Sequence, residues 1–233
     1  MLTSEILSGW LAWAQPLLAT WWTAWGVPVS YLEALAFVLS LWMVACNLRV
    51  NPLGWPLAIA SSLLYGILFA QYGLYGEASL QLVFVVMAVW GWWQWLRGVD
   101  AQQQALKVRK LSAQGRLVSM GALVMLWPVL GGLLDHITDS TVPYWDALPT
   151  AGSLIGQWLL GRKWVDNWPC WLAVNVISMG LFAYKELWLT VILYGIFAVL
   201  SAVGWRQWLS LAAQGSCTIG GNLATNAGGV QVL

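Results

Sequence analysis

Long stretches of this sequence contain no charged residue, and this feature constrains the fold more than any other. The stretch 50–76 has none over 27 positions, and 117–134 has none over 18. Uncharged apolar runs of about 18 to 25 residues are long enough to cross a bilayer as a helix. Of the 233 residues, 60% are hydrophobic and only 8% are charged, whereas about a quarter of a soluble domain is charged. The sequence therefore predicts an all-α polytopic membrane protein.

The apolar runs predict seven transmembrane helices. A polar, basic loop at 97–115 separates the first three helices from the others, and 116–134 forms a single linking helix. We therefore expect a first three-helix unit at 29–96 and a second one at 143–208. The expected spans are 29–48, 53–72, 76–96, 116–134, 143–161, 166–184 and 187–208.

Lysine and arginine lie almost entirely on one side of this topology. With seven spans, nine of the ten basic residues fall on the side of the loop 97–115, and only Lys185 falls on the other. Loops rich in these residues stay in the cytoplasm. We therefore expect the N-terminus outside and the C-terminus in the cytoplasm. A topology signal also explains the basic loop better than nucleic-acid binding does.

The two ends of the chain fall outside these spans. Residues 1–28 contain five tryptophans but no lysine or arginine. Because indole rings favour the headgroup level of a membrane, we expect an N-terminal interfacial helix there, with an eighth span as the alternative. The tail at 209–233 is rich in glycine and is predicted to be disordered.

The two three-helix units resemble each other. Residues 31–95 match 144–208 at a constant offset of 113 without a gap, including the pattern Gly-Trp-x-Gln-Trp that ends both stretches. A gap-free match of this length predicts an internal duplication. Because the three helices of the first repeat and the linking helix together cross the membrane four times, the second repeat enters the membrane in the same orientation as the first. Parallel repeats are typical of transporters, which hold a substrate between them near mid-bilayer.

Several helix faces carry candidates for that site. On the helix 76–96, aromatic and polar residues recur on one face at helical spacing, and the last helix repeats this face. Asn175 lies at the centre of helix 166–184, where a polar side chain faces the protein interior and suggests a binding site. The candidate substrate-binding residues are Gln81, Trp92, Trp95, Trp171, Asn175 and Tyr194.

The types of these residues narrow the ligand only partly. Tryptophan faces suit a cation or a flat electron-poor ring, while asparagine and glutamine bind hydroxyl or carboxamide groups. An aromatic cationic nucleoside fits both, but a sugar also stacks on tryptophan. The alternative for Asn175 is a hydrogen bond that only joins two helices.

Two stretches of the sequence resemble the PnuC family of bacterial nicotinamide riboside transporters. They are "YGEASLQLVFVVMAVWGWWQW" and "YWDALPTAGSLIGQWLLGRKWVDNWPCWLAVNVIS", and the resemblance covers about residues 29–208. Trp92 and Trp95 match the family's Trp-x-x-Trp motif, Asn175 and Tyr194 match its polar positions, and Gln81 lies in the similar stretch "ASLQ".

The resemblance implies a complete transport mechanism. It implies seven spans in a 3+1+3 arrangement, similar to the SWEET sugar transporters, in a homotrimer of the bacterial inner membrane. The implied activity is facilitated diffusion of nicotinamide riboside, with phosphorylation in the cytosol trapping the product.

Other functions have less support in the sequence. The expected spans hold no ionisable residue near mid-depth, which predicts transport without ion coupling.

We expect neither an enzyme nor a cofactor or metal site, because no nucleophile–base pair is evident and His136 is a single histidine. The expected partners are a small-molecule substrate and the lipid bilayer, with no nucleic acid. The alternatives are a transporter of thiamine or riboflavin, and a non-transporting membrane scaffold or receptor.

Overall fold

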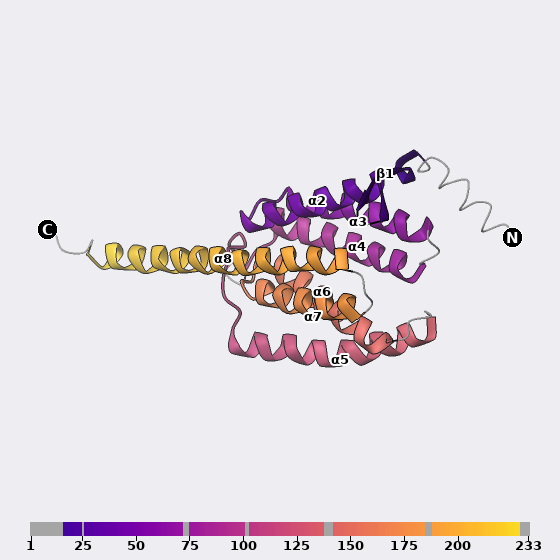
Figure 1. Cartoon of the computed structure of the whole chain (residues 1–233). Helices are drawn as coiled ribbons and strands as arrows, with labels where there is room; N and C mark the ends of the chain where they lie inside the picture. Colours follow the sequence, from indigo (N-terminus) through magenta and orange to yellow (C-terminus); the bar gives the residue numbers. More distant parts are fainter. Residues whose placement is uncertain are drawn as a thin grey trace. The chain divides into compact units, whose positions relative to one another are not determined.

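A computed structural model gives the fold of the chain (Figure 1). The described residues are 16–24, 26–71, 75–100, 103–137, 142–184 and 188–228. They form seven α-helices and one two-stranded sheet. The chain has two compact units, Met1–Trp92 and Trp93–Leu233.

Each helix is built from one apolar stretch of the sequence. In the first unit α2 packs on α3, and in the second α5 packs on α6, α6 on α7 and α7 on α8 (Figure 1). The helices are α2 (Tyr31–Leu48), α3 (Gly54–Gln71), α4 (Tyr75–Arg97), α5 (Ala113–Ile137), α6 (Pro143–Gly161), α7 (Asn167–Tyr184) and α8 (Trp188–Gly228).

Five of the described helices are long and apolar enough to cross a membrane. They are α2, α3, most of α4, most of α5 and residues 191–214 of α8. The other two, α6 and α7, fall outside this group, and their polar side chains Gln157, Asn167 and Asn175 are buried. These polar side chains therefore face the protein interior. The structure is that of a helical membrane protein.

The N-terminal segment folds differently from the expectation. Instead of an interfacial helix, its described part forms an antiparallel hairpin of β1 (Thr20–Ala24) and β2 (Val27–Ser30). Threonine, tryptophan and valine favour strands, and Gly26 adopts the positive φ of 84° that the turn requires. The prediction of a helix is therefore wrong for residues 20–24 and 27–28, while residues 1–15 lie outside the described part.

The C-terminal segment also differs from the expectation. Disorder was predicted for 209–233, but α8 continues to Gly228. Extending an existing helix requires no new nucleus, so a sequence with poor helix propensity can continue one. Residues 229–233 lie outside the described part.

The two three-helix segments have the same local structure. Shifting the bounds of α2 and α3 by 113 gives the bounds of α6 and α7 to within one residue, and the start of α4 shifts to the start of α8. The connecting loops agree as well, because Val50 and Lys163 both have a positive φ, of 54° and 56°. Each of these two residues donates its backbone N–H to the carbonyl three positions earlier, at 3.1 and 2.9 Å.

One side-chain contact recurs in both segments. The Trp55 ring lies directly against the α-carbon of Gly91, and the Trp168 ring lies against that of Gly204 in the same way. Both tryptophans are almost fully buried, at 1% and 3% exposure. Because only a glycine leaves room for an indole at this distance, the Gly-Trp-x-Gln-Trp pattern is partly a packing motif. The shared contact supports an internal duplication.

Candidate functional site

Asn175 lies in the interface between α7 and α8. Its amide Nδ2 donates to Ser201 Oγ of α8 at 3.2 Å, and the two side chains are 5% and 4% exposed. Ser178, one turn further along α7, is also buried at 3% exposure. A small polar region therefore lies within an otherwise apolar helix pair.

The hydroxyl of Ser201 determines how the Asn175 amide is oriented. Ser201 has one hydroxyl proton, which it donates to the Phe197 carbonyl at 2.8 Å. Ser201 Oγ can then only accept, so the amide nitrogen of Asn175 must face it. Within the described part of the second unit, no group donates to Asn175 Oδ1. Asn175 therefore keeps a carbonyl acceptor that a ligand can use.

Aromatic contacts flank the Asn175–Ser201 pair along the same interface. Seven residues further along α7, Phe182 contacts Tyr194 of α8, with ring centroids 5.1 Å apart. Seven residues in the opposite direction, Trp168 meets Trp208 edge to face at 5.6 Å. Seven helical residues correspond to about 10 Å. The α7–α8 interface is thus a series of contacts in which one polar pair lies between two aromatic pairs.

Trp171 lies one turn before Asn175 and faces α6. A β-carbon on Gly156 of α6 would lie 3.1 Å from the Trp171 indole ring. The absence of a side chain at Gly156 therefore lets α6 approach this ring. The second unit thus brings Trp171, Asn175 and Tyr194 onto α7 and α8, at successive levels of the helix pair.

Trp95 has a well-defined packing role in the second unit. Its indole N–H donates to the Leu160 carbonyl at the end of α6, at 3.0 Å, and its side chain is 7% exposed. Its ring lies 6.1 Å from the Trp208 ring, and the Lys163 amine lies 5.1 Å from its centroid. These contacts use both the indole N–H and the ring of Trp95 for packing, near the ends of α4 and α6. Its role as a ligand residue stays a prediction.

Gln81 and Trp92 belong to the first unit. Trp92 is 37% exposed, the most exposed of the predicted tryptophans. Gln81 is partly buried, and its β-carbon lies 3.5 Å from the position that a β-carbon on Gly66 of α3 would occupy. Both residues stay candidates for the substrate site.

The sequence interpretation missed a polar cluster at the end of the second unit. Arg162 donates to Gln94 Oε1 at 2.9 Å, and the Lys163 amine donates to the Leu106 carbonyl at 3.1 Å. Burial lowers the pKa of the Lys163 amine below its ordinary value of 10.5. Arg162 and Gln94 each have a counterpart at the offset of 113. This repetition is the one sequence signal that marks the two residues.

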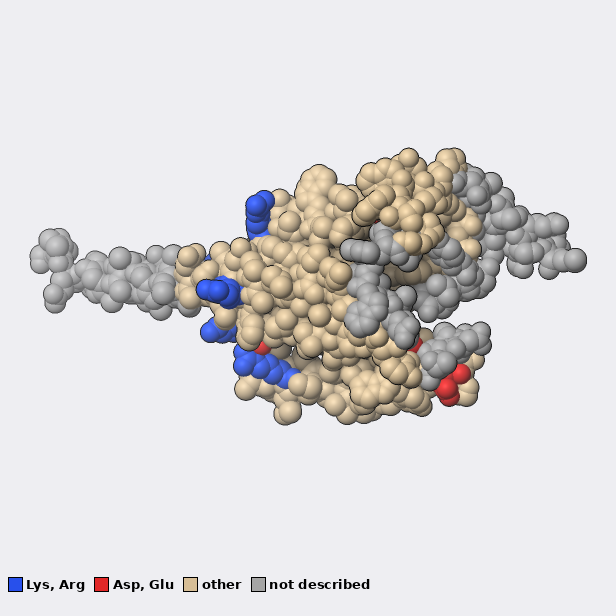
Figure 2. Space-filling model, in the orientation of Figure 1, with Lys and Arg blue, Asp and Glu red and all other residues tan. Residues whose placement is uncertain are grey.

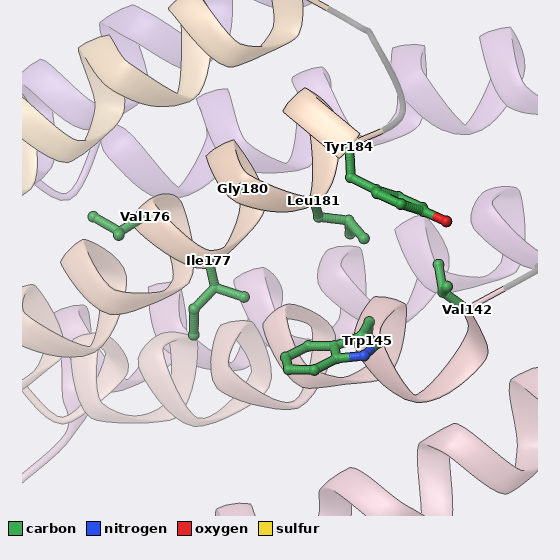
Figure 3. Close-up of a pocket in the computed structure, with 7 residues that line it drawn as sticks. All are labelled: Val142, Trp145, Val176, Ile177, Gly180, Leu181 and Tyr184. Carbon is green, nitrogen blue, oxygen red and sulfur yellow. The ribbon is translucent and has the colours of Figure 1, made fainter.

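A separate apolar cavity of about 520 Å³ opens on another face of α7. In Figure 3, Trp145 from the start of α6 lies opposite Ile177 and Leu181 of α7. The other residues that line the cavity are Val142, Val176, Gly180 and Tyr184. The cavity includes none of the predicted substrate residues, and we assign it no role in transport.

Known proteins share this sequence and this fold. PnuC of Escherichia coli (strain K12), a nicotinamide riboside transporter, is 26% identical over 213 residues, covering 81% of this chain and 89% of the relative. RibM of Streptomyces davaonensis, a riboflavin/roseoflavin transporter, is 27% identical over 185 residues, covering 77% and 85%. The crystal structure of the vitamin B3 transporter PnuC has a TM-score of 0.67 at 21% identity and covers 90% of both chains.

The family model described as nicotinamide mononucleotide transporter matches residues 30–210, which include all seven helices to beyond the middle of α8. The matched region contains both repeated segments and the Asn175–Ser201 pair. The chain therefore belongs to the nicotinamide mononucleotide transporter family, as a multi-pass membrane transporter and not an enzyme.

Proposed function

We propose that this protein carries nicotinamide riboside across the bacterial inner membrane by facilitated diffusion, driven by phosphorylation of the substrate in the cytosol. The Escherichia coli relative is named as a transporter of this nucleoside. The observation that carries the proposal is the Asn175–Ser201 hydrogen bond of 3.2 Å, which holds a buried amide in a fixed orientation.

The chemistry of nicotinamide riboside suits this arrangement. Its ribose hydroxyls and carboxamide N–H groups are donors, so they complement the acceptor Oδ1 of Asn175. Its pyridinium ring is flat and cationic, and tryptophan faces are the best aromatic partners for a cation. The indole N–H of Trp95 already donates to the Leu160 carbonyl, whereas Trp171 lies one turn before Asn175 on the same helix. We propose that the ring of the substrate stacks on Trp171, while Trp92 of the first unit stays a separate candidate.

The proposed transport needs no coupling ion. The sequences of α3 and α7 contain no ionisable acid, base or histidine between Gly54 and Gln71 or between Asn167 and Ser178. Ion-coupled carriers commonly keep such a residue within the membrane. Uptake in proteoliposomes should therefore reach equal concentrations inside and outside, with or without a sodium or proton gradient.

We further propose how the chain is arranged in the membrane. The shared local structure of the two three-helix segments supports two parallel repeats joined by α5, which is the 3+1+3 arrangement. The distribution of lysine and arginine supports an N-terminus outside and a C-terminus in the cytoplasm. A homotrimer remains the expected assembly.

The test combines ligand binding with one site variant and one control. Nicotinamide riboside, riboflavin and thiamine are titrated into the purified full-length protein by calorimetry, and the titrations are repeated with Asn175→Leu. We expect nicotinamide riboside alone to bind. Its affinity should be at least about tenfold weaker in Asn175→Leu, because a hydrogen-bond donor of the substrate loses the buried acceptor Oδ1 of Asn175. Ser153→Ala removes a hydroxyl that bonds only within α6, to the Pro149 carbonyl at 2.8 Å, and should leave the affinity unchanged.

Riboflavin is the second candidate substrate, because the Streptomyces davaonensis relative that transports it is as similar in sequence as the Escherichia coli one. Binding of riboflavin alone would establish that alternative. The absence of saturable binding, together with an unaltered thermal stability of Asn175→Leu, would favour a membrane scaffold or receptor.

A further inference from the structure

The loop between α4 and α5 is fixed to the loop between α6 and α7. The two backbones form a parallel bridge, in which Arg109 N donates to Lys163 O at 3.2 Å and Val165 N donates to Arg109 O at 2.9 Å. The Arg109 guanidinium also lies 4.2 Å from the centroid of the Trp164 ring. These contacts place Lys110, the next residue, beside the start of α7.

Asp166 joins this loop to α5. One carboxylate oxygen accepts from Leu111 N at 2.7 Å, and the other accepts from Arg116 Nε at 2.7 Å. Each oxygen therefore already has a donor. An arginine has five N–H groups, so four remain on the terminal nitrogens of Arg116, whose side chain is 59% exposed. The ion pair orients Arg116 without using most of its donors.

A cavity of about 440 Å³ opens at this point of the second unit. Two cations and one carboxylate line it, which leaves a formal charge of +1 after Asp166 is matched by Arg116. Its other walls are apolar, and they come from the start of α7 and from α8. The lining residues are Lys110, Arg116, Val165, Asp166, Pro169, Trp205 and Leu209.

In the orientation proposed above, the cavity lies at the level of the cytoplasmic membrane surface. Figure 2 shows lysine and arginine gathered at the end of the second unit where α5 begins, and acidic side chains where α5 ends. The basic end is the cytoplasmic one in the orientation proposed above. Trp205 is 39% exposed, as expected for a tryptophan at the headgroup level. The cytoplasmic leaflet is rich in anionic lipids, which attract basic sites at this depth.

We propose that this cavity binds the phosphate group of an anionic phospholipid from the cytoplasmic leaflet. Lys110 and the terminal nitrogens of Arg116 hold the phosphate, and the upper part of an acyl chain lies along Trp205 and Leu209. The shared chemistry is a phosphate ester, which a free phosphate compound also carries. The apolar wall favours the lipid, because a free phosphate gains nothing from Trp205 and Leu209. This proposal rests on the proposed orientation but not on the identity of the transported substrate.

The test uses lipid binding by the purified full-length protein. Native mass spectrometry is used to titrate the delipidated protein with phosphatidylglycerol and, separately, with phosphatidylcholine. We expect phosphatidylglycerol to bind more tightly, and Lys110→Ala to weaken that binding about fivefold, since one basic residue near a membrane contributes roughly that factor. Lys107→Ala removes an exposed charge from the same loop that does not line the cavity, and it should leave the affinity unchanged.

Three results would overturn the proposal. One is equal affinity for the two lipids, and another is an equal effect of Lys110→Ala and Lys107→Ala, which would indicate general attraction to positive charge. The third is displacement of phosphatidylglycerol by inorganic phosphate or nicotinamide mononucleotide at comparable concentrations, which would assign the site to a free phosphate compound. Nicotinamide riboside binding is measured on the same Lys110→Ala sample, and it should be unchanged.

Discussion

The contact between Gly204 and Trp168 leads to a prediction with a defined magnitude. A β-carbon at Gly204 would lie 2.5 Å from two atoms of the Trp168 ring and 2.6 Å from a third, whereas ordinary contact begins at 3.4 Å. The ring has little freedom to move away, because it is 3% exposed and lies against Trp208. The substitution Gly204→Ala therefore forces an overlap of about 1 Å into a packed interface.

The expected net effect is a loss of about 2 kcal/mol in stability. Overpacking a rigid site costs up to about 3 kcal/mol, and replacing glycine by alanine inside a helix returns up to about 1 kcal/mol. In a protein of this size, 2 kcal/mol corresponds to a fall in melting temperature of about 4–8 °C. The assay is thermal unfolding of the purified protein, followed by the fluorescence of a thiol-reactive dye or by loss of the monodisperse peak.

A matched variant isolates the effect of the ring. Gly180→Ala changes a glycine of α7 whose β-carbon would meet nothing within 4 Å, so it should leave the melting temperature unchanged or raise it slightly. Gly91→Ala, the counterpart of Gly204→Ala in the first unit, should be destabilising in the same way. Equal melting temperatures for Gly204→Ala and Gly180→Ala would refute the reasoning.

Three further predictions concern polar contacts of the second unit. Ser201→Ala removes the partner of the Asn175 amide, and an unpaired buried group costs about 1–3 kcal/mol. Calorimetry should show weaker substrate binding by Ser201→Ala. Ser201→Thr keeps the hydroxyl and should restore the binding. Asp166→Asn removes the charge that holds Arg116 and should weaken the docking of the α4–α5 loop by about 1 kcal/mol. Trypsin should then cut at Lys107 about fivefold faster. An unchanged cleavage rate would contradict the role of Asp166. Burial lowers the pKa of Lys163, so the unfolded state binds more protons at alkaline pH, and stability should rise as the pH approaches 10.5; this rise should be absent in Lys163→Met.

The helices could be predicted from the sequence because each one is a long apolar stretch with charged residues at its ends. The offset of 113 also predicted that the two three-helix segments would resemble each other, and their loops and their glycine–tryptophan contacts agree closely. Apolar periodicity and repetition along the chain were sufficient for both results.

The ends of the chain were harder to predict, because composition describes them poorly. Tryptophan suits a membrane interface in a strand as well as in a helix, so its abundance in residues 1–28 did not reveal the hairpin at Thr20–Ala24 and Val27–Ser30. Gly26 and Pro28 were the better signals, since glycine favours a turn and proline opposes a helix. Glycine in the tail likewise suggested disorder, whereas helix propagation continues α8 to Gly228.

The site could be predicted in part. Helical spacing placed Asn175 on a buried face, but it could not show that Ser201 fixes the orientation of the amide, because that depends on where the hydroxyl proton of Ser201 goes. Spacing also placed Trp95 beside Trp92 on one face. The hydrogen bond from Trp95 to the Leu160 carbonyl joins residues 65 positions apart, and no local pattern indicates such a contact.

The most direct test of the central claim is calorimetric titration of nicotinamide riboside into the wild-type protein and into Asn175→Leu. The account predicts saturable binding by the wild type and a loss of at least about tenfold in affinity in the variant, with the melting temperature still showing a folded protein. Equal affinities of the wild type and Asn175→Leu for nicotinamide riboside would contradict the placement of the substrate at Asn175. Binding of riboflavin in place of nicotinamide riboside would contradict the proposed substrate.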